Sequence, residues 1–189
     1  MAIKTFTSGE VLTASDTNTF LANSGLVYVA GGALSGSATN FVGCFSSTYR
    51  NYRVIIDNPT NTAAGEFYLR YLQGTTPTSG AGYYWAYVGI SSAGAGFNGA
   101  AGANVNGFLG WETVGAGGFG AISIDICSPN VGTRTIANVQ TTFLGSGAYI
   151  GRSGALAWDT TAVFDGLRIL SGGGSSLTGN VAIYGYRKA

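Results

Sequence analysis

Hydrophobic and polar residues alternate along most of this chain, which is the pattern of β-strands that bury one face. In residues 49–57 the apolar positions Tyr52, Val54 and Ile56 alternate with polar ones, so we expect these three side chains to face a core. Further inward-facing sets are Phe67, Leu69 and Tyr71, and Ile122, Ile124 and Ile126. The segments expected as strands are 26–30, 40–45, 49–57, 66–72, 83–90, 107–114, 119–127, 134–144, 155–158, 164–170 and 180–186.

Glycine, asparagine, serine and proline separate these segments and predict the turns. We expect a turn at residues 58–61, a loop at 74–82 and turn character across 145–154. Residues 91–106 are almost entirely Gly, Ala, Ser and Asn, which leaves a long loop or a weak strand around Phe97 as alternatives. No helical period intervenes between strands, so the spacing predicts an all-β fold, either an antiparallel sandwich or a jelly roll.

The first 25 residues differ from the rest because they contain the one convincing helix pattern. Thr13 is suited to cap the helix, Asp16 follows three residues later, and the Asn23-Ser24-Gly25 run ends it. A helix this short is marginal in water and needs a surface to pack on. The sequence therefore predicts two parts: an N-terminal arm at residues 1–25 and a β domain at residues 26–189.

The arm carries several apolar side chains that need burial. We expect them to pack against a neighbouring protein or a partner copy rather than to stay in water. They are Phe6, Val11, Leu12, Phe20 and Leu21.

Composition narrows the possible partners. Only 9% of residues are charged, against about 25% in ordinary soluble proteins, and 32 residues are glycine. A surface with so few charges suits a protein that lies against other proteins. The net charge of +1 provides no electrostatic footprint for nucleic acid, and no apolar stretch predicts a signal peptide or membrane insertion.

The chain contains no histidine, which excludes His-based catalysis and His-ligated metal sites. Its two cysteines, Cys44 and Cys127, lie in apolar runs where buried free thiols are more common than a disulfide, although a disulfide stays open. No clustered oxygen ligands indicate calcium, so we expect neither a metal nor a cofactor. The eight carboxylates offer no evident catalytic pair, and we expect a protein without enzyme activity.

One group of aromatic residues leaves two interpretations open. Aromatic faces can stack on sugar rings, as they do in lectins and adhesins. Alternatively, alternate members fill the core and the others pack at a subunit interface. The group comprises Tyr83, Tyr84, Trp85, Tyr87 and Trp111.

Residues 3–18, Ile-Lys-Thr-Phe-Thr-Ser-Gly-Glu-Val-Leu-Thr-Ala-Ser-Asp-Thr-Asn, resemble the K-T-F-x-x-G-E-V-L-T-A-x-D-x-N opening of many phage virion proteins. That opening occurs on tail fibres, minor tail proteins and other surface appendages. The remainder resembles a jelly-roll module of phage surface proteins. The resembling segments are Tyr49–Val54, Phe164–Ile169 and Gly179–Gly185.

The resemblance implies a bacteriophage structural protein, assembled in the host cytoplasm and located in the virion. It implies a homo-oligomer, most often a trimer, that docks on other virion proteins through the arm. A tail fibre or minor tail protein is the first hypothesis and a capsid decoration or cement protein on the head is the second. A carbohydrate-binding adhesin for host attachment is the third, with a host surface glycan as partner, and a glycan hydrolase is the fourth.

Overall fold

Strands make up almost all the regular structure of the protein. The structure, a computed structural model, describes residues 7–11, 13–14, 25–63, 66–80, 82–94, 98–105, 107–111, 120–145 and 147–187. Within this part of the chain all strand pairs are antiparallel. The expected all-β, antiparallel class is therefore confirmed.

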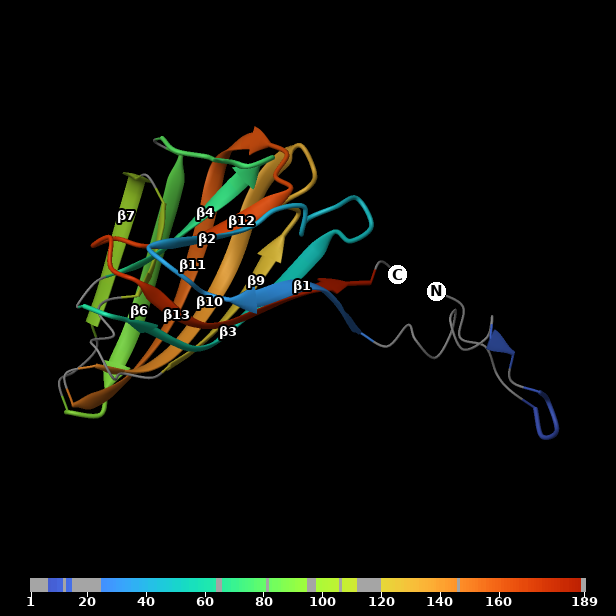
Figure 1. Cartoon of the computed structure of the whole chain (residues 1–189), viewed down its shortest axis with the longest axis horizontal. Coiled ribbons are helices and arrows are strands. Elements are labelled where there is room, and N and C mark those ends of the chain that lie inside the picture. The colour runs from blue at the N-terminus through green and yellow to red at the C-terminus, as the bar shows by residue number, and fades with distance from the viewer. Residues whose placement is uncertain are drawn as a thin grey trace.

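The strands form two sheets of different size, and the smaller one lies over part of the larger one (Figure 1). The larger sheet has the order β1 (Leu26–Ala33), β13 (Leu177–Tyr186), β3 (Asn51–Asn61), β9 (Gly120–Cys127), β10 (Thr133–Gly145), β11 (Ala148–Ala162), β6 (Tyr83–Ser91) and β7 (Asn98–Val105). The smaller sheet has the order β2 (Ala38–Phe41), β12 (Gly166–Ser171), β4 (Phe67–Gln73) and β5 (Thr76–Pro77), and β8 (Phe108–Trp111) also pairs with β4.

The core lies between the sheets and follows the alternation of the sequence. Tyr52, Val54 and Ile56 are fully buried on β3, as are the predicted inward-facing residues of β4 and β9. An aromatic cluster joins the two sheets, with the Tyr71 and Phe164 rings stacked at 4.6 Å and the Tyr83 and Trp158 rings edge-on at 4.6 Å. The predicted core faces are therefore confirmed.

The turn expected at residues 58–61 is wrong, because β3 continues to Asn61. A β-bulge accommodates Pro59 there: the pairing with β13 shifts between Thr178 and Asn180, and Asn58 has a φ of 47°. Opposite the bulge, Gly179 has a φ of 118°, and a Cβ on it would lie 2.9 Å from the Asn58 carbonyl oxygen. Only glycine fits at that position.

Other boundaries also need correction. The turn character expected across residues 145–154 is wrong, because β11 begins at Ala148 and continues through the predicted 155–158 strand. The loop expected at 74–82 contains the short strand β5. The strand expected at 40–45 ends at Phe41. In the glycine-rich region β7 forms a strand over 98–105, whereas Phe97, around which a weak strand was one alternative, lies outside the described residues.

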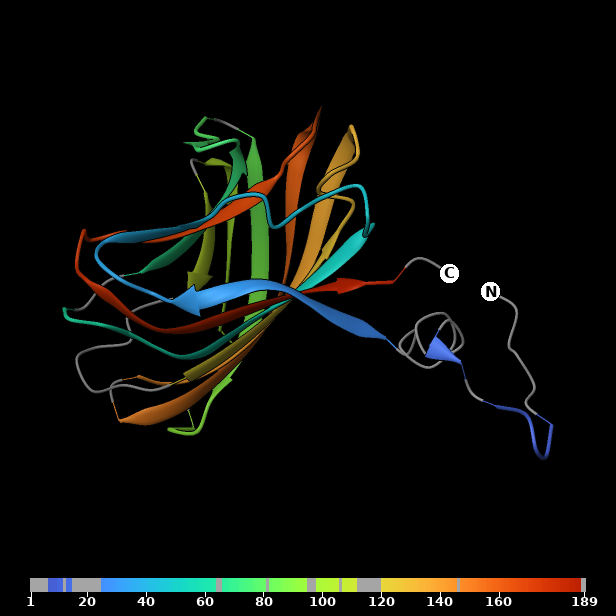
Figure 2. The ribbon, with the colours of Figure 1, turned by 45° about the vertical axis from the view of Figure 1, so that its right-hand side comes forward.

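The described part of the N-terminal arm lies off the end of the sandwich at which β13 finishes. Figure 2 shows residues 7–11 well away from the sheets on that side. A hydrogen bond at 3.0 Å from the Glu10 amide to the Thr7 carbonyl closes a local turn. The predicted helix falls mainly on residues 15–24, which lie outside the described residues.

Candidate interaction surface

The outer face of the larger sheet, which points away from the smaller sheet, collects exposed apolar side chains. Ten large hydrophobic residues are exposed in the described part of the chain, and seven of them lie on this face by strand alternation and register. The seven are Leu26, Tyr28, Ile55, Val88, Ile90, Ile136 and Tyr149. Because exposed apolar patches are a common feature of interaction sites, this face is the candidate interaction surface of the protein.

This outer face divides into two halves with different chemistry. We call β1, β13, β3 and β9 the β13 half, and β10, β11, β6 and β7 the β11 half. The two halves meet where β9 pairs with β10.

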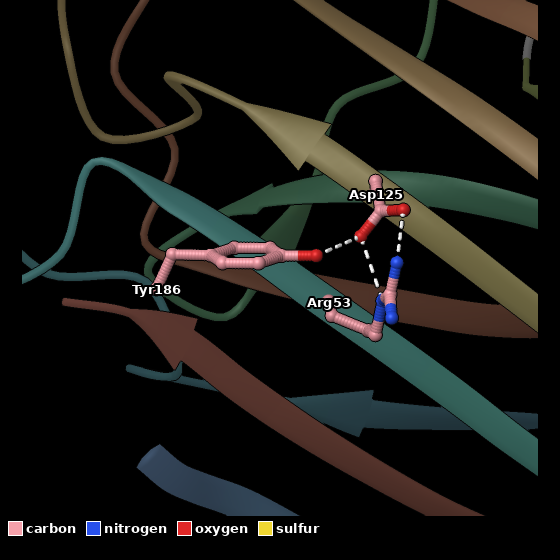
Figure 3. Close-up of polar contacts among 3 residues, drawn as sticks. All are labelled: Arg53, Asp125 and Tyr186. Atoms are coloured by element: carbon pink, nitrogen blue, oxygen red, sulfur yellow. Dashed lines mark hydrogen bonds and ion pairs between the residues drawn. The ribbon is translucent and has the colours of Figure 1, made fainter. Parts of the chain in front are cut away.

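A polar cluster dominates the β13 half and joins three neighbouring strands (Figure 3). The Arg53 guanidinium on β3 donates two hydrogen bonds to the Asp125 carboxylate on β9, from Nε at 2.8 Å and Nη2 at 2.6 Å. The Tyr186 hydroxyl on β13 donates to the same carboxylate at 2.6 Å. This bidentate geometry fixes the charges against each other, so the cluster presents little net charge to a partner.

The electrostatics of the cluster follow from these contacts. Hydrogen bonds from Arg53 hold the pKa of Asp125 below its usual value, and the Tyr186 hydroxyl acts in the same direction. Burial, together with the hydrogen bond to Asp125, raises the pKa of Tyr186. Both partners of the ion pair are 36% exposed, which limits the energy that the pair contributes.

The β11 half has a shallow trough on its outer face instead of a charged cluster. The depression has a volume of about 590 Å³. Five alanines from three strands form much of it, and the larger side chains of Tyr84 and Ile136 stand beside them. The alanines are Ala86, Ala101, Ala103, Ala155 and Ala157.

Charges are almost absent from the β11 half. Its four strands contain three charged residues, Arg134, Arg152 and Asp159. Arg152 points to the inner face, where it is 7% exposed and its guanidinium lies 4.3 Å from the Tyr87 ring centroid. Arg134 and Asp159 pair with each other at 3.0 Å at one end of the face. The trough itself is therefore uncharged.

The aromatic residues singled out in the sequence do not form one platform. Tyr83 is fully buried in the core, and Trp85 and Tyr87 share its inner face, half-buried and stacked at 5.8 Å. Tyr84 faces the other way and lines the trough. Trp111 lies in β8, and its side chain is outside the described residues.

Of the arm residues expected to dock, only Val11 lies within the described part of the chain. It is 79% exposed. Phe6, Leu12, Phe20 and Leu21 lie outside it, so their docking stays a prediction.

The described residues hold no group of three or more Asp, Glu or Cys side chains placed to bind a metal. Cys44 and Cys127 are free thiols, which answers the open question of a disulfide between them. Burial raises the pKa of Cys44 to about 12. In the described part of the chain no helix is long and apolar enough to span a bilayer.

Sequence reasoning missed the trough, although one signal pointed to it. Every second position from 84 to 90 is apolar, namely Tyr84, Ala86, Val88 and Ile90, and these side chains lie on the face opposite Tyr83. A strand that is apolar on both faces indicates burial on both sides.

No model of a known protein family matches the chain, and a search of curated proteins finds no match.

Proposed function

We propose that this protein is a non-enzymatic structural protein of a phage virion, a tail fibre or minor tail protein. In this proposal it is an oligomeric jelly-roll appendage, a trimer, and its N-terminal arm docks it onto other virion proteins. The observation that carries the proposal is the division of the chain into a charge-poor β-sandwich and an arm that stands off one end, with Val11 79% exposed. The virion-protein resemblance of residues 3–18 falls on that arm.

Strand order supports the jelly-roll part of the proposal. A jelly roll of eight strands numbered along the chain has the sheet orders 1-8-3-6 and 2-7-4-5. Here β1-β13-β3-β9 gives the first order, and β2-β12-β4 with β8 beside β4 gives the second. The remaining strands are then two insertions: β5 to β7 between β4 and β8, and β10 with β11 between β9 and β12.

The surface supports a structural role. The trough on the outer face is lined by uncharged residues, and the ion pairs Arg53–Asp125 and Arg134–Asp159 of the larger sheet neutralise their own charges. A face of this kind fits contact with protein better than contact with charged substrates.

Removal of the arm tests the proposal. A chain lacking residues 2–23 is expected to keep the thermal unfolding transition of the full chain and to be missing from purified particles. The full chain supplied in the same way is the control for incorporation. If the shortened chain unfolds, the arm belongs to the domain's own core and the docking idea fails.

Placement in the particle separates the two leading hypotheses. Electron microscopy of particles carrying a labelled copy is expected to show label at the tail. Label over the whole head surface would instead support a capsid decoration protein and reject the tail assignment.

One pocket favours the adhesin alternative. A depression of about 380 Å³ brings the half-buried Trp85 together with Tyr68 and Arg70 on β4. An indole face beside a phenol and a guanidinium is a combination that binds sugars. The Tyr68 hydroxyl donates to the Glu66 carboxylate, and burial raises the pKa of Tyr68 to about 12, so the phenol stays protonated. A glycan array without binding would remove this alternative.

A further inference from the structure

We propose that the outer face of the β11 half is the surface on which a second copy of this chain docks. This inference deepens the proposed function, on which it rests, by naming the subunit interface of the oligomer. Three independent properties of the face support it: its relief, its lack of charge and its area.

The shape of this face is suited to packing against the same face of a second copy of the chain. The alanine trough lies between larger side chains on the same face, with Ile136 and Tyr84 on one side and Val88 and Ile90 on the other. Val88, Ile90 and Ile136 are 53%, 58% and 55% exposed. One surface therefore carries both the projections and the hollow that tight packing requires, and alanines allow close approach of a second backbone.

The lack of charge narrows the class of partner. Nucleic acid and anionic membranes are bound through arginine and lysine, and the trough has neither. A second copy meets the face with the same uncharged, apolar chemistry, so no buried charge is left unpaired.

The area is sufficient for a specific contact. Four strands about 4.8 Å apart and about eight residues long, at about 3.3 Å per residue, cover about 500 Å². Two copies would bury about 1,000 Å² together, near the lower bound of about 1,000 Å² for a biological interface.

The edge strand β7 supplies a further observation on the same half. It is the last strand of the larger sheet, and its sequence Asn-Gly-Ala-Ala-Gly-Ala-Asn-Val contains no charge and no proline. Edge strands that face water usually carry charged residues or proline, which prevent pairing with other chains. The absence of charge and proline from β7, beside the trough, fits an edge strand that a second copy approaches.

Charged substitutions in the trough test the inference. Ala155→Glu and Ala101→Glu each place a carboxylate on the outer face, on β11 and on the edge strand β7. Ala33→Glu is the matched control, since Ala33 is also an exposed strand alanine but lies on β1 at the opposite edge of the sheet. Sedimentation equilibrium measures the mass of the full chain, and circular dichroism melts check folding.

We expect the wild type and Ala33→Glu to be oligomers and both trough variants to be folded monomers. Because like charges facing each other cost several kcal/mol, association should weaken at least about a hundredfold. The inference is overturned if the wild type is monomeric at about 50 µM, because that concentration lies well above the dissociation constants of stable oligomers. An oligomer that persists in either folded trough variant also overturns it; Ala101→Glu decides if Ala155→Glu does not fold.

The outcome also separates this inference from the proposed function. An oligomer that dissociates in the trough variants but is absent from particles supports the interface and rejects the virion role. A wild-type dimer that dissociates in the same way keeps the interface and rejects the trimer.

Discussion

The two halves of the larger sheet have similar inner faces and different outer faces. On the inner face both bury apolar residues, such as Ile56 in the β13 half and Leu156 in the β11 half. On the outer face the β13 half carries the Arg53–Asp125–Tyr186 cluster, whereas the β11 half carries alanines. The inner faces are similar because both contribute to one packed core, whereas the outer faces are free to differ because they lie outside that core.

The largest effect is expected from the aromatic cluster that ties both halves to the smaller sheet. Phe164 is fully buried and contacts Tyr71 of the smaller sheet and Trp158 of the β11 half. Phe164→Ala should lower the free energy of unfolding by about 3–5 kcal/mol, because it removes a buried ring and leaves a cavity. Denaturant unfolding measures the change.

The neighbouring Val163, which is 50% exposed, provides the control. Val163→Ala should change stability by less than about 0.5 kcal/mol. A loss of stability in Phe164→Ala no larger than that in Val163→Ala would contradict the role assigned to the buried ring.

The next effect concerns the contact between β11 and β6 inside the β11 half. A Cβ on Gly154 would lie 2.6 Å from the Ala86 carbonyl oxygen, which is backbone and cannot move without parting the strands. Gly154→Ala should therefore destabilise the protein by about 1–3 kcal/mol. A thermal melt or urea titration measures it.

Gly151 on the same strand is the matched control, since a Cβ there would have no neighbour within 4 Å. Gly151→Ala should be neutral or slightly stabilising, because glycine costs entropy in a strand. Equal losses in both variants would show that the close approach of β11 and β6 is not the cause.

The sequence was sufficient for the class of fold because alternation is a local signal. Tyr52, Val54 and Ile56 are buried where the period of two places them. It was insufficient where tertiary contact overrides local preference. Pro59 predicts a turn, yet it lies in β3 because a β-bulge and Gly179 on the partner strand accommodate it.

The candidate interaction surface was harder to predict than the fold. The aromatic run is evident in the sequence, but strand alternation divides it between two faces, with Tyr83 in the core and Tyr84 at the trough. The trough itself joins alanines from β6, β7 and β11, three strands whose neighbourhood depends on the sheet order. Local patterns in a sequence do not contain that order.

A smaller effect is expected from the polar cluster of the β13 half. Asp125→Asn removes the ion pair with Arg53 and should cost about 1 kcal/mol near neutral pH, because the pair is partly exposed. The folded state lowers the pKa of Asp125, so its contribution is present above the ordinary carboxyl pKa and is lost as pH falls through the lowered value. The difference between wild type and variant should thus be constant above about pH 5 and shrink below about pH 4.

Asp159 offers the comparison within the β11 half, because it also pairs with an arginine but both side chains are more exposed, at 53% and 70%. Asp159→Asn should change the free energy of unfolding by less than about 0.5 kcal/mol. A pH-independent difference for Asp125→Asn would show that the loss is steric and not electrostatic.

The smallest effect is a labelling rate at the line where the halves meet. Cys127 is half-buried on β9 and pairs with Ile136 of the trough, while the fully buried Cys44 has its pKa raised to about 12 by desolvation. Because the thiolate is the reactive form, a maleimide should modify the native chain once, at Cys127, and a second time only after unfolding.

If a second copy covers the β11 half, Cys127 should react more slowly in the wild type than in folded Ala155→Glu, as followed by intact mass. Equal rates in an oligomeric wild type and the variant would place the interface away from this line, and rapid labelling of Cys44 in the native protein would contradict its burial.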